Sequence, residues 1–302
     1  MSLEFATSHI LWRPFAREND SPAVDDGQLK VVKDFVNAFF CSHGHSGQAQ
    51  DAHALRWYAA QDVTFRTMLK QLVGELANQA VLNDLDLVVL AHWTPDVEVG
   101  CSVTNAIIYE TGAHDAFGMA ISDHGLSSTF LALQVIEDYL GDMNHGGQGK
   151  KALLLIADQD AILYDSPALA RLNPVPSACV VMLRSLPGER VGGQPASIVF
   201  KHYRKVAVPG TPPALDTLLV TLDMFTSGEN LLPLLILTTP CFAGQLRQHG
   251  QLATHRIESW DETLLSSAPW VRSKELATSS QRILWLLPEG KHLVCAGFVA
   301  EV

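Results

Sequence analysis

The chain has 302 residues, of which 47% are hydrophobic and 18% are charged, and its formal net charge is −11. Disordered chains show the opposite balance, with many charges and few large apolar groups, so this composition excludes that class. Because Lys and Arg form no cluster, we expect neither a nucleic-acid surface nor binding to an anionic membrane. At about 150 residues per domain, the length predicts two units or one large α/β domain.

No segment is long and apolar enough to predict a transmembrane helix, which needs about 20 residues. The longest apolar stretch, Leu231 to Leu237, is interrupted by Pro233. The first residues carry no basic region ahead of an apolar one, so we expect no signal peptide and a cytoplasmic location.

The cysteines and histidines do not form a recognisable metal or disulfide pattern. The cysteines are odd in number, widely spaced and without a CxxC pair, which predicts buried, reduced thiols. His43 and His45 lie in a Gly/Ser-rich stretch that predicts a surface loop rather than a ligand pair. We therefore expect no metal and no cofactor. The five cysteines are Cys41, Cys101, Cys179, Cys241 and Cys295.

Helical and extended patterns alternate in the first half. Apolar residues recur near a 3.6 period from Asp62 to Asn83, which predicts an amphipathic helix. The next run, Leu85 to Ala91, is so apolar that it predicts a strand covered on both faces and ended by a Thr-Pro pair. Further strands are expected over residues 115–122, 151–160 and 177–186, and a second helix over 123–142.

The second half repeats this order of elements, which predicts a duplicated α/β fold with layers α-β-α-β-α. Residues 187–213, rich in Gly and Pro, predict the connection, and we place the halves at 1–190 and 191–302. The expected elements are a strand at 197–206 in a hairpin with 177–186, a helix at 215–225, a strand at 231–242 that again meets Thr-Pro, a short helix at 278–287 and a last strand at 292–302.

Common catalytic fingerprints are missing: the sequence has no GxxxxGK[ST], no GxGxxG after a strand and no GxSxG. One combination is more specific. The run LDLVVLAHWTPD and the later LSSTFLALQVIEDYL resemble the first half of ketoacyl-ACP synthase III enzymes of the thiolase superfamily. The segments PCFAG, ATS and PEGKHLVCAGF resemble, in the same order, parts of that family's second half. The resemblance covers about residues 62–302 and implies a thiolase-like fold.

The resemblance implies which residues stand at the family's three catalytic positions. Ala132-Leu133-Gln134-Val135 matches the helix that follows the nucleophilic cysteine, which places Leu126 at the cysteine. Cys241 falls at the histidine, and Ala277, before Thr278-Ser279, falls at the asparagine. Acyl condensation needs a thiolate and two polar groups that stabilise developing charge. Leucine, cysteine and alanine supply neither, so we expect an abandoned catalytic site.

Alternatives remain open. Ser127 is a second candidate nucleophile, with Asp123 and His124 as a relay, although a serine at a helix start more often caps the helix. Cys241 is a third candidate, although a lone cysteine is more often a small apolar filler. His92 and Trp93 are candidates for lining a pocket, although an aromatic residue at the end of a buried strand more often belongs to the core.

The leading hypothesis is a non-catalytic ketosynthase-like subunit in polyketide or fatty-acid-like secondary metabolism, similar to the cysteine-less subunit of the alkylquinolone-forming synthase. The resemblance implies a heterodimer with an active ketosynthase, or a homodimer, joined through the strand at 116–121. Acyl-CoA or an acyl carrier protein is a further expected partner, although net charge −11 disfavours direct docking of an acidic carrier. The other hypotheses are an active acyltransferase that uses Ser127 or Cys241, and an acyl-binding scaffold homodimer.

Overall fold

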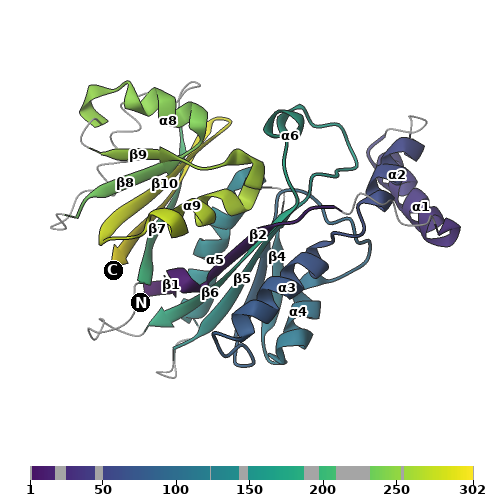
Figure 1. The fold of residues 1–302 in the computed structure, drawn as a ribbon, viewed down its shortest axis with the longest axis horizontal. Coiled ribbons are helices and arrows are strands. Elements are labelled where there is room, and N and C mark those ends of the chain that lie inside the picture. Colours follow the sequence, from purple (N-terminus) through teal and green to yellow (C-terminus); the bar gives the residue numbers. More distant parts are fainter. Residues whose placement is uncertain are drawn as a thin grey trace.

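The computed structural model describes residues 2–17, 25–44, 50–122, 124–142, 149–186, 197–208, 232–252 and 255–301. Within these ranges the strands form one hydrogen-bonded sheet of 11 strands, drawn in Figure 1. The expected helix at 215–225 and the expected boundary at 190/191 lie outside the described residues. Among the described residues, no helix is long and apolar enough to cross a membrane.

The two halves of the sheet have the same strand order and the same strand directions. The first half runs β4-β3-β5-β6-β1, and the second runs β9-β8-β10-β11-β7. In each, two parallel neighbours are followed by two antiparallel ones, so the predicted duplication is confirmed. The strands are β1 (Ser2–Ala6), β2 (Ile10–Pro14), β3 (Leu87–Ala91), β4 (Phe117–Ile121), β5 (Lys151–Asp158), β6 (Ser177–Leu186), β7 (Ser197–Ala207), β8 (Leu234–Thr238), β9 (Arg256–Ser259), β10 (Gln281–Glu289) and β11 (His292–Glu301).

The first strand of the chain corrects one expectation. The strands β6 and β7 do not form a hairpin, because β1 lies between them and pairs antiparallel with both. This pairing also joins the two halves into one sheet. Because β6 and β7 are neighbours in the sequence, a hairpin is the simplest expectation. The strand that separates them, β1, lies near the start of the sequence, and nothing in the sequence around β6 and β7 indicates it. A second short strand, β2, extends the pairing along β6.

Helices form three layers around the two halves of the sheet. The buried cores show that α3 and α4 cover one face of the first half, that α5 and α9 lie between the halves, and that α8 covers the far face of the second half. The predicted α-β-α-β-α layering is therefore confirmed. The helices are α1 (Asp26–Ser42), α2 (Gln50–Ala59), α3 (Phe65–Ala77), α4 (Val103–Thr111), α5 (Ser128–Asp142), α6 (Pro167–Leu172), α8 (Pro240–Arg247) and α9 (Ala268–Leu276).

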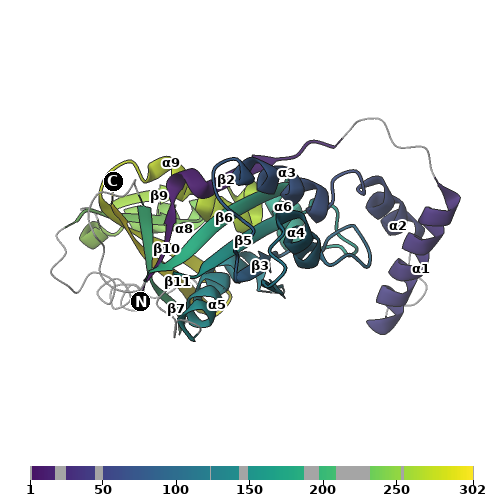
Figure 2. The ribbon, with the colours of Figure 1, turned by 90° about the horizontal axis from the view of Figure 1, so that it is seen from below.

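The prediction of a short helix at 278–287 is wrong, since these residues form most of β10. Their apolar run lies between the parallel β8 and the antiparallel β11 and is buried on both faces. Short apolar runs of this kind do not distinguish a buried strand from a helix. The helices α1 and α2 were not expected at all. They form a hairpin that projects from one end of the body in Figure 2.

Candidate functional site

Two short 3-10 turns lead into the two helices of the middle layer and meet at a cavity between the halves. The turn η2 (Gly125–Ser127) precedes α5, and η4 (Glu262–Ser267) precedes α9. The cavity has a volume of about 820 Å³, and we call it the central cavity. Its lining residues come from both halves: Trp93, Gly125, Leu126, Ala168, Arg171, Leu172, Thr239, Pro240, Cys241, Trp260, Asp261, Glu262, Thr263, Leu287, Pro288, Glu289 and Gly290.

The structure brings two of the three expected catalytic positions into this cavity. Leu126 lies in η2, where the positive φ of Gly125 (57°) lets the chain turn from β4 toward α5. Cys241 faces the same space from the first turn of α8, which begins after Thr239 accepts a capping hydrogen bond from the Phe242 N–H. Cys241 is exposed, as is Cys41, so the expectation of buried thiols is wrong for these two. It is confirmed for Cys179 and Cys295.

Ala277 does not join them. It follows the last turn of α9, is only 6% exposed and packs in the core between the halves. The expectation that it precedes a helix is wrong, because β10 comes next. The turn before α9 that faces the central cavity is η4, and its first residue, Glu262, lines the cavity.

The side chain of Leu126 is part of an apolar cluster. Leu169, Leu172 and Leu265 are buried at its centre, and Leu126 packs against them together with Trp93 and Ile162. Leu265 belongs to η4 and has φ 43° and ψ −121°, a strained backbone conformation for a leucine. Leu126 therefore serves packing in this chain.

The suggested relay through Ser127 has a different geometry from the one expected. Ser127 is buried, and its hydroxyl lies 2.7 Å from the backbone carbonyl of His124 and 2.9 Å from the carboxylate of Glu289. Its hydrogen-bond contact with His124 is therefore to the backbone carbonyl rather than to the ring, and Asp123 lies outside the described residues. A hydroxyl has one proton, so it donates to only one of these two acceptors at a time.

Carboxylates dominate the charge of the central cavity. Asp261, Glu262 and Glu289 line it, Arg171 is the one basic residue of the described lining, and the Lys205 ammonium lies 3.8 Å from the Glu289 carboxylate. Burial raises the pKa of Glu262 above its ordinary value; Arg171 opposes this shift and Asp261 adds to it. Neither Glu262 nor Glu289 was singled out from the sequence, because no motif marks them. Carboxylates thus outnumber basic side chains in the described lining.

Asp158 fixes the geometry where the halves meet. Its fully buried carboxylate accepts hydrogen bonds from the backbone N–H groups of Trp93 and Thr94, both at 2.8 Å, and from that of Ser266 at 2.9 Å. It also accepts one from the Thr94 hydroxyl at 3.2 Å. Burial raises its pKa, against the effect of these donors. The residue ties the end of β5 to the segment after β3 and to η4.

The two aromatic residues expected at the end of β3 do line cavities. His92 contributes to a second cavity, beside α1 and α2, and Trp93 contributes to both cavities. Within the described residues, no group of three or more His, Cys, Asp or Glu side chains is arranged to hold a metal ion.

No protein-family model and no curated protein matches the sequence. Solved structures do match the fold. The acyltransferase ChlB3 has TM-score 0.58 and 16% identity, over 100% of this chain and 98% of that one. A type III pentaketide synthase from Neurospora crassa has TM-score 0.59 and 10% identity, over 98% and 99%. A 3-oxoacyl-(acyl-carrier-protein) synthase III has TM-score 0.53 and 11% identity, over 78% and 85%. The chain thus has the thiolase-like fold of condensing and acyl-transferring enzymes.

Proposed function

We propose that this chain is a non-catalytic subunit of a thiolase-fold condensing system, and that it pairs with an active ketosynthase. The observation that carries the proposal is the packing of Leu126. The side chain at the family's nucleophile position supports an apolar cluster and has no group that could form a thioester. The similar structures are named as condensing or acyl-transferring proteins, which supports a role in that kind of chemistry.

The electrostatics of the central cavity support the same proposal. Carrier-bound and CoA-bound acyl groups arrive on arms that carry phosphate, and a phosphate is favoured by positive charge at the site. Three carboxylates and one arginine line this cavity among the described residues. The partner subunit would then supply both the nucleophile and the basic docking surface. The products would belong to polyketide or fatty-acid-like secondary metabolism, and the complex would work in the cytoplasm.

The edge strand β4 supports a paired state. It lies at the end of the sheet order and its outer edge has no neighbour among the described strands. Phe117 on this strand is 53% exposed and stacks on Tyr139, with ring centroids 5.8 Å apart. Unpaired edges with exposed apolar groups invite another strand. We propose that β4 pairs with an active ketosynthase subunit, or with a second copy of this chain when that subunit is missing.

A second candidate function is an active acyltransferase with a non-standard nucleophile. Cys241 favours it, because its side chain is exposed and lines the central cavity. Ser127 also favours it, because the Glu289 carboxylate lies within hydrogen-bond distance of its hydroxyl. The carboxylate is a candidate base in that mechanism.

Intact-protein mass spectrometry after incubation with acetyl-CoA and with octanoyl-CoA separates the two functions. We expect the wild-type chain to keep its mass, because Leu126 cannot be acylated. A stable acyl adduct that disappears in Cys241→Ala or in Ser127→Ala would contradict the proposal and establish the acyltransferase. An active ketosynthase encoded beside this chain and co-purifying with it would identify the expected partner.

A further inference from the structure

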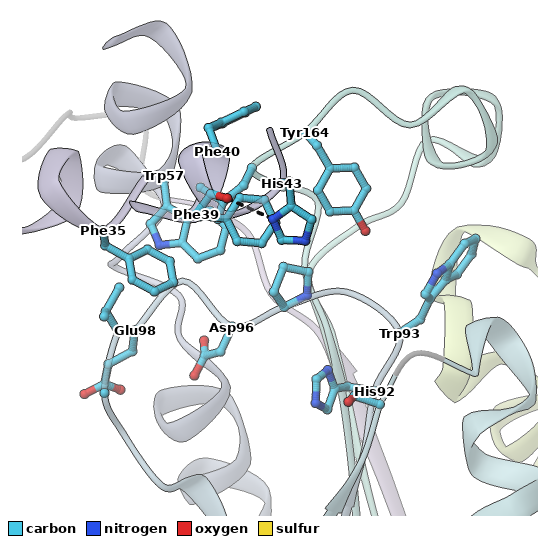
Figure 3. Close-up of a pocket in the computed structure, with 15 residues that line it drawn as sticks. Phe35, Phe39, Phe40, His43, Trp57, His92, Trp93, Asp96, Glu98 and Tyr164 are labelled. Carbon is cyan, nitrogen blue, oxygen red and sulfur yellow. Dashed lines mark hydrogen bonds between the residues drawn. The ribbon is translucent and has the colours of Figure 1, made fainter. Parts of the chain in front are cut away.

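A second cavity, which the proposed function does not use, lies between the α1–α2 hairpin and the body. It has a volume of about 800 Å³, and we call it the aromatic cavity. One wall is the hairpin, and the others are the segments that follow β3, β4 and β5 (Figure 3). Its lining residues are Phe35, Phe39, Phe40, His43, Trp57, His92, Trp93, Pro95, Asp96, Glu98, Val99, Gly100, Ser122, Leu163 and Tyr164.

The aromatic rings of this cavity are held in place by the hairpin. Phe35 and Phe39 lie one helical turn apart on α1, so both rings face the same side. The ring centroids of Phe35 and Trp57 lie 6.3 Å apart. The Trp57 indole is fixed because its N–H donates a hydrogen bond of 2.7 Å to the Val97 carbonyl. The ring centroids of Phe39 and Tyr164 lie 6.5 Å apart, and the angle between the two ring planes is 14°. Several ring faces therefore border one space, and each face carries partial negative charge.

Two carboxylates complete the cavity, and they differ in how they are neutralised. Glu98 is paired with Arg66 through two hydrogen bonds, of 2.7 and 3.1 Å. Asp96 accepts a hydrogen bond through Oδ1 from the backbone N–H of Phe65, and its buried Oδ2 has no hydrogen-bond partner among the described residues. Figure 3 shows both carboxylates on the same side of the site, near Phe35. Burial raises the pKa of Asp96 to about 6. Asp96 thus forms no ion pair of its own among the described residues, and the nearby Arg66 is paired with Glu98.

We propose that the aromatic cavity binds a small molecule that joins an aromatic or apolar body to a protonated amine, with the amine between Asp96 and the ring faces of Phe35 and Trp57. A cation is attracted both by a carboxylate and by the faces of aromatic rings. The described lining contains two histidines and no Lys or Arg, so an anionic ligand finds no fixed positive charge. The volume lies within the range of small-molecule sites.

Dansylcadaverine is a suitable probe because it joins a fluorescent naphthalene ring to a primary amine. Its N-acetyl derivative keeps the ring and the chain and loses the cation. We expect the amine to bind the full-length protein at pH 7.5 with a blue-shifted emission, and the acetylated probe to bind about tenfold more weakly or worse. Tryptamine, which carries a different ring, should displace the bound probe.

The variant Asp96→Asn should weaken binding of the amine by about tenfold and leave binding of the acetylated probe unchanged. Asp34→Asn is the matched control, because it removes an exposed carboxylate of α1 that does not line the cavity. Tyr164→Leu removes an aromatic face at the half-exposed rim and should weaken both probes. If Asp96→Asn does not fold, as judged by circular dichroism, Tyr164→Leu alone decides whether the probe occupies this cavity.

Several outcomes would overturn the proposal. Equal affinity for the two probes would show that the cation does not matter, and no binding of either amine would show that the cavity is not an amine site. Binding that survives both Asp96→Asn and Tyr164→Leu would place the probe elsewhere. Amine binding to a monomer that vanishes in a dimer, measured by light scattering, would assign the cavity to a partner chain instead. None of these results depends on whether the chain transfers acyl groups, so failure here leaves the proposed function standing.

Discussion

Replacing Asp96 by asparagine isolates the free energy of burying its carboxylate. In the folded chain, burial raises the pKa of this group from 3.8 to about 6, and the nearby Glu98 adds to the rise. The backbone N–H groups of Phe65, Glu98 and Val97 oppose the shift without cancelling it. A rise of about two units corresponds to about 3 kcal/mol, since each unit is worth about 1.36 kcal/mol. The folded state is therefore penalised by up to about this amount wherever Asp96 must be ionised.

The sign of the pH dependence follows from proton binding. Between about pH 4 and pH 6, the folded chain keeps the Asp96 proton while the unfolded chain has lost it. Stability therefore falls as the pH rises through this window and is lowest above about pH 6. The variant Asp96→Asn has no such proton, so its stability relative to the wild type should improve by about 3 kcal/mol between pH 4 and pH 8.

Urea unfolding at a series of pH values measures this difference. The asparagine amide takes the place of a buried Oδ2 and changes the free energy of unfolding by an amount that does not depend on pH. It therefore does not affect how the difference between variant and wild type changes with pH. Asp34→Asn, the exposed carboxylate of α1, controls for the change in net charge. A free-energy difference between Asp96→Asn and wild type that stays constant from pH 4 to pH 8 would refute the burial of an ionisable Asp96.

Two further predictions concern the core between the halves and the sheet edge. Asp158→Ala removes the acceptor of three backbone N–H groups and one hydroxyl, so we expect a loss of about 3 to 5 kcal/mol in urea unfolding, against little change for the exposed Asp115→Ala. A charged residue in place of Phe117 or Met119 on β4 should abolish association or lower solubility. Light scattering that gives wild-type protein the 32.9 kDa monomer mass would contradict this reading of β4.

Local patterns predicted the elements that are long and strongly apolar. The strand expected at 85–91 is β3, and the helix expected at 123–142 contains η2 and α5. The second Thr-Pro pair follows β8 directly, and Pro240 begins α8; the first pair, Thr94-Pro95, lies beyond His92 and Trp93, so it does not itself end β3. The thiolase-like fold could be predicted because several such segments occur in the right order.

The parts of the site that sequence reasoning missed depend on contacts far apart in the chain. Asp158 and Ser266 are 108 residues apart, and no local pattern indicates that a buried carboxylate accepts from that N–H. Thr278-Ser279 resembles a helix start and so points to Ala277, whereas α9 ends there and a strand follows. The Ser127–Glu289 contact likewise joins the two halves across 162 residues.

The duplicated topology places two leucines at corresponding points of the two halves, beside the central cavity. In the first half, β4 leads through η2 into α5, and in the second half β9 leads through η4 into α9. The turns η2 and η4 are therefore equivalent, and they contact each other. Leu126 belongs to η2 and Leu265 to η4, and both pack in the same apolar cluster. The Asp158 carboxylate accepts a hydrogen bond from the Ser266 N–H and so fixes η4 next to the strained Leu265. A smaller or polar group at position 126 would give up these leucine contacts, which would weaken the packing between the two turns. Leu126 therefore packs where the halves meet and offers no nucleophile there, and we propose on this ground that catalysis falls to a partner subunit.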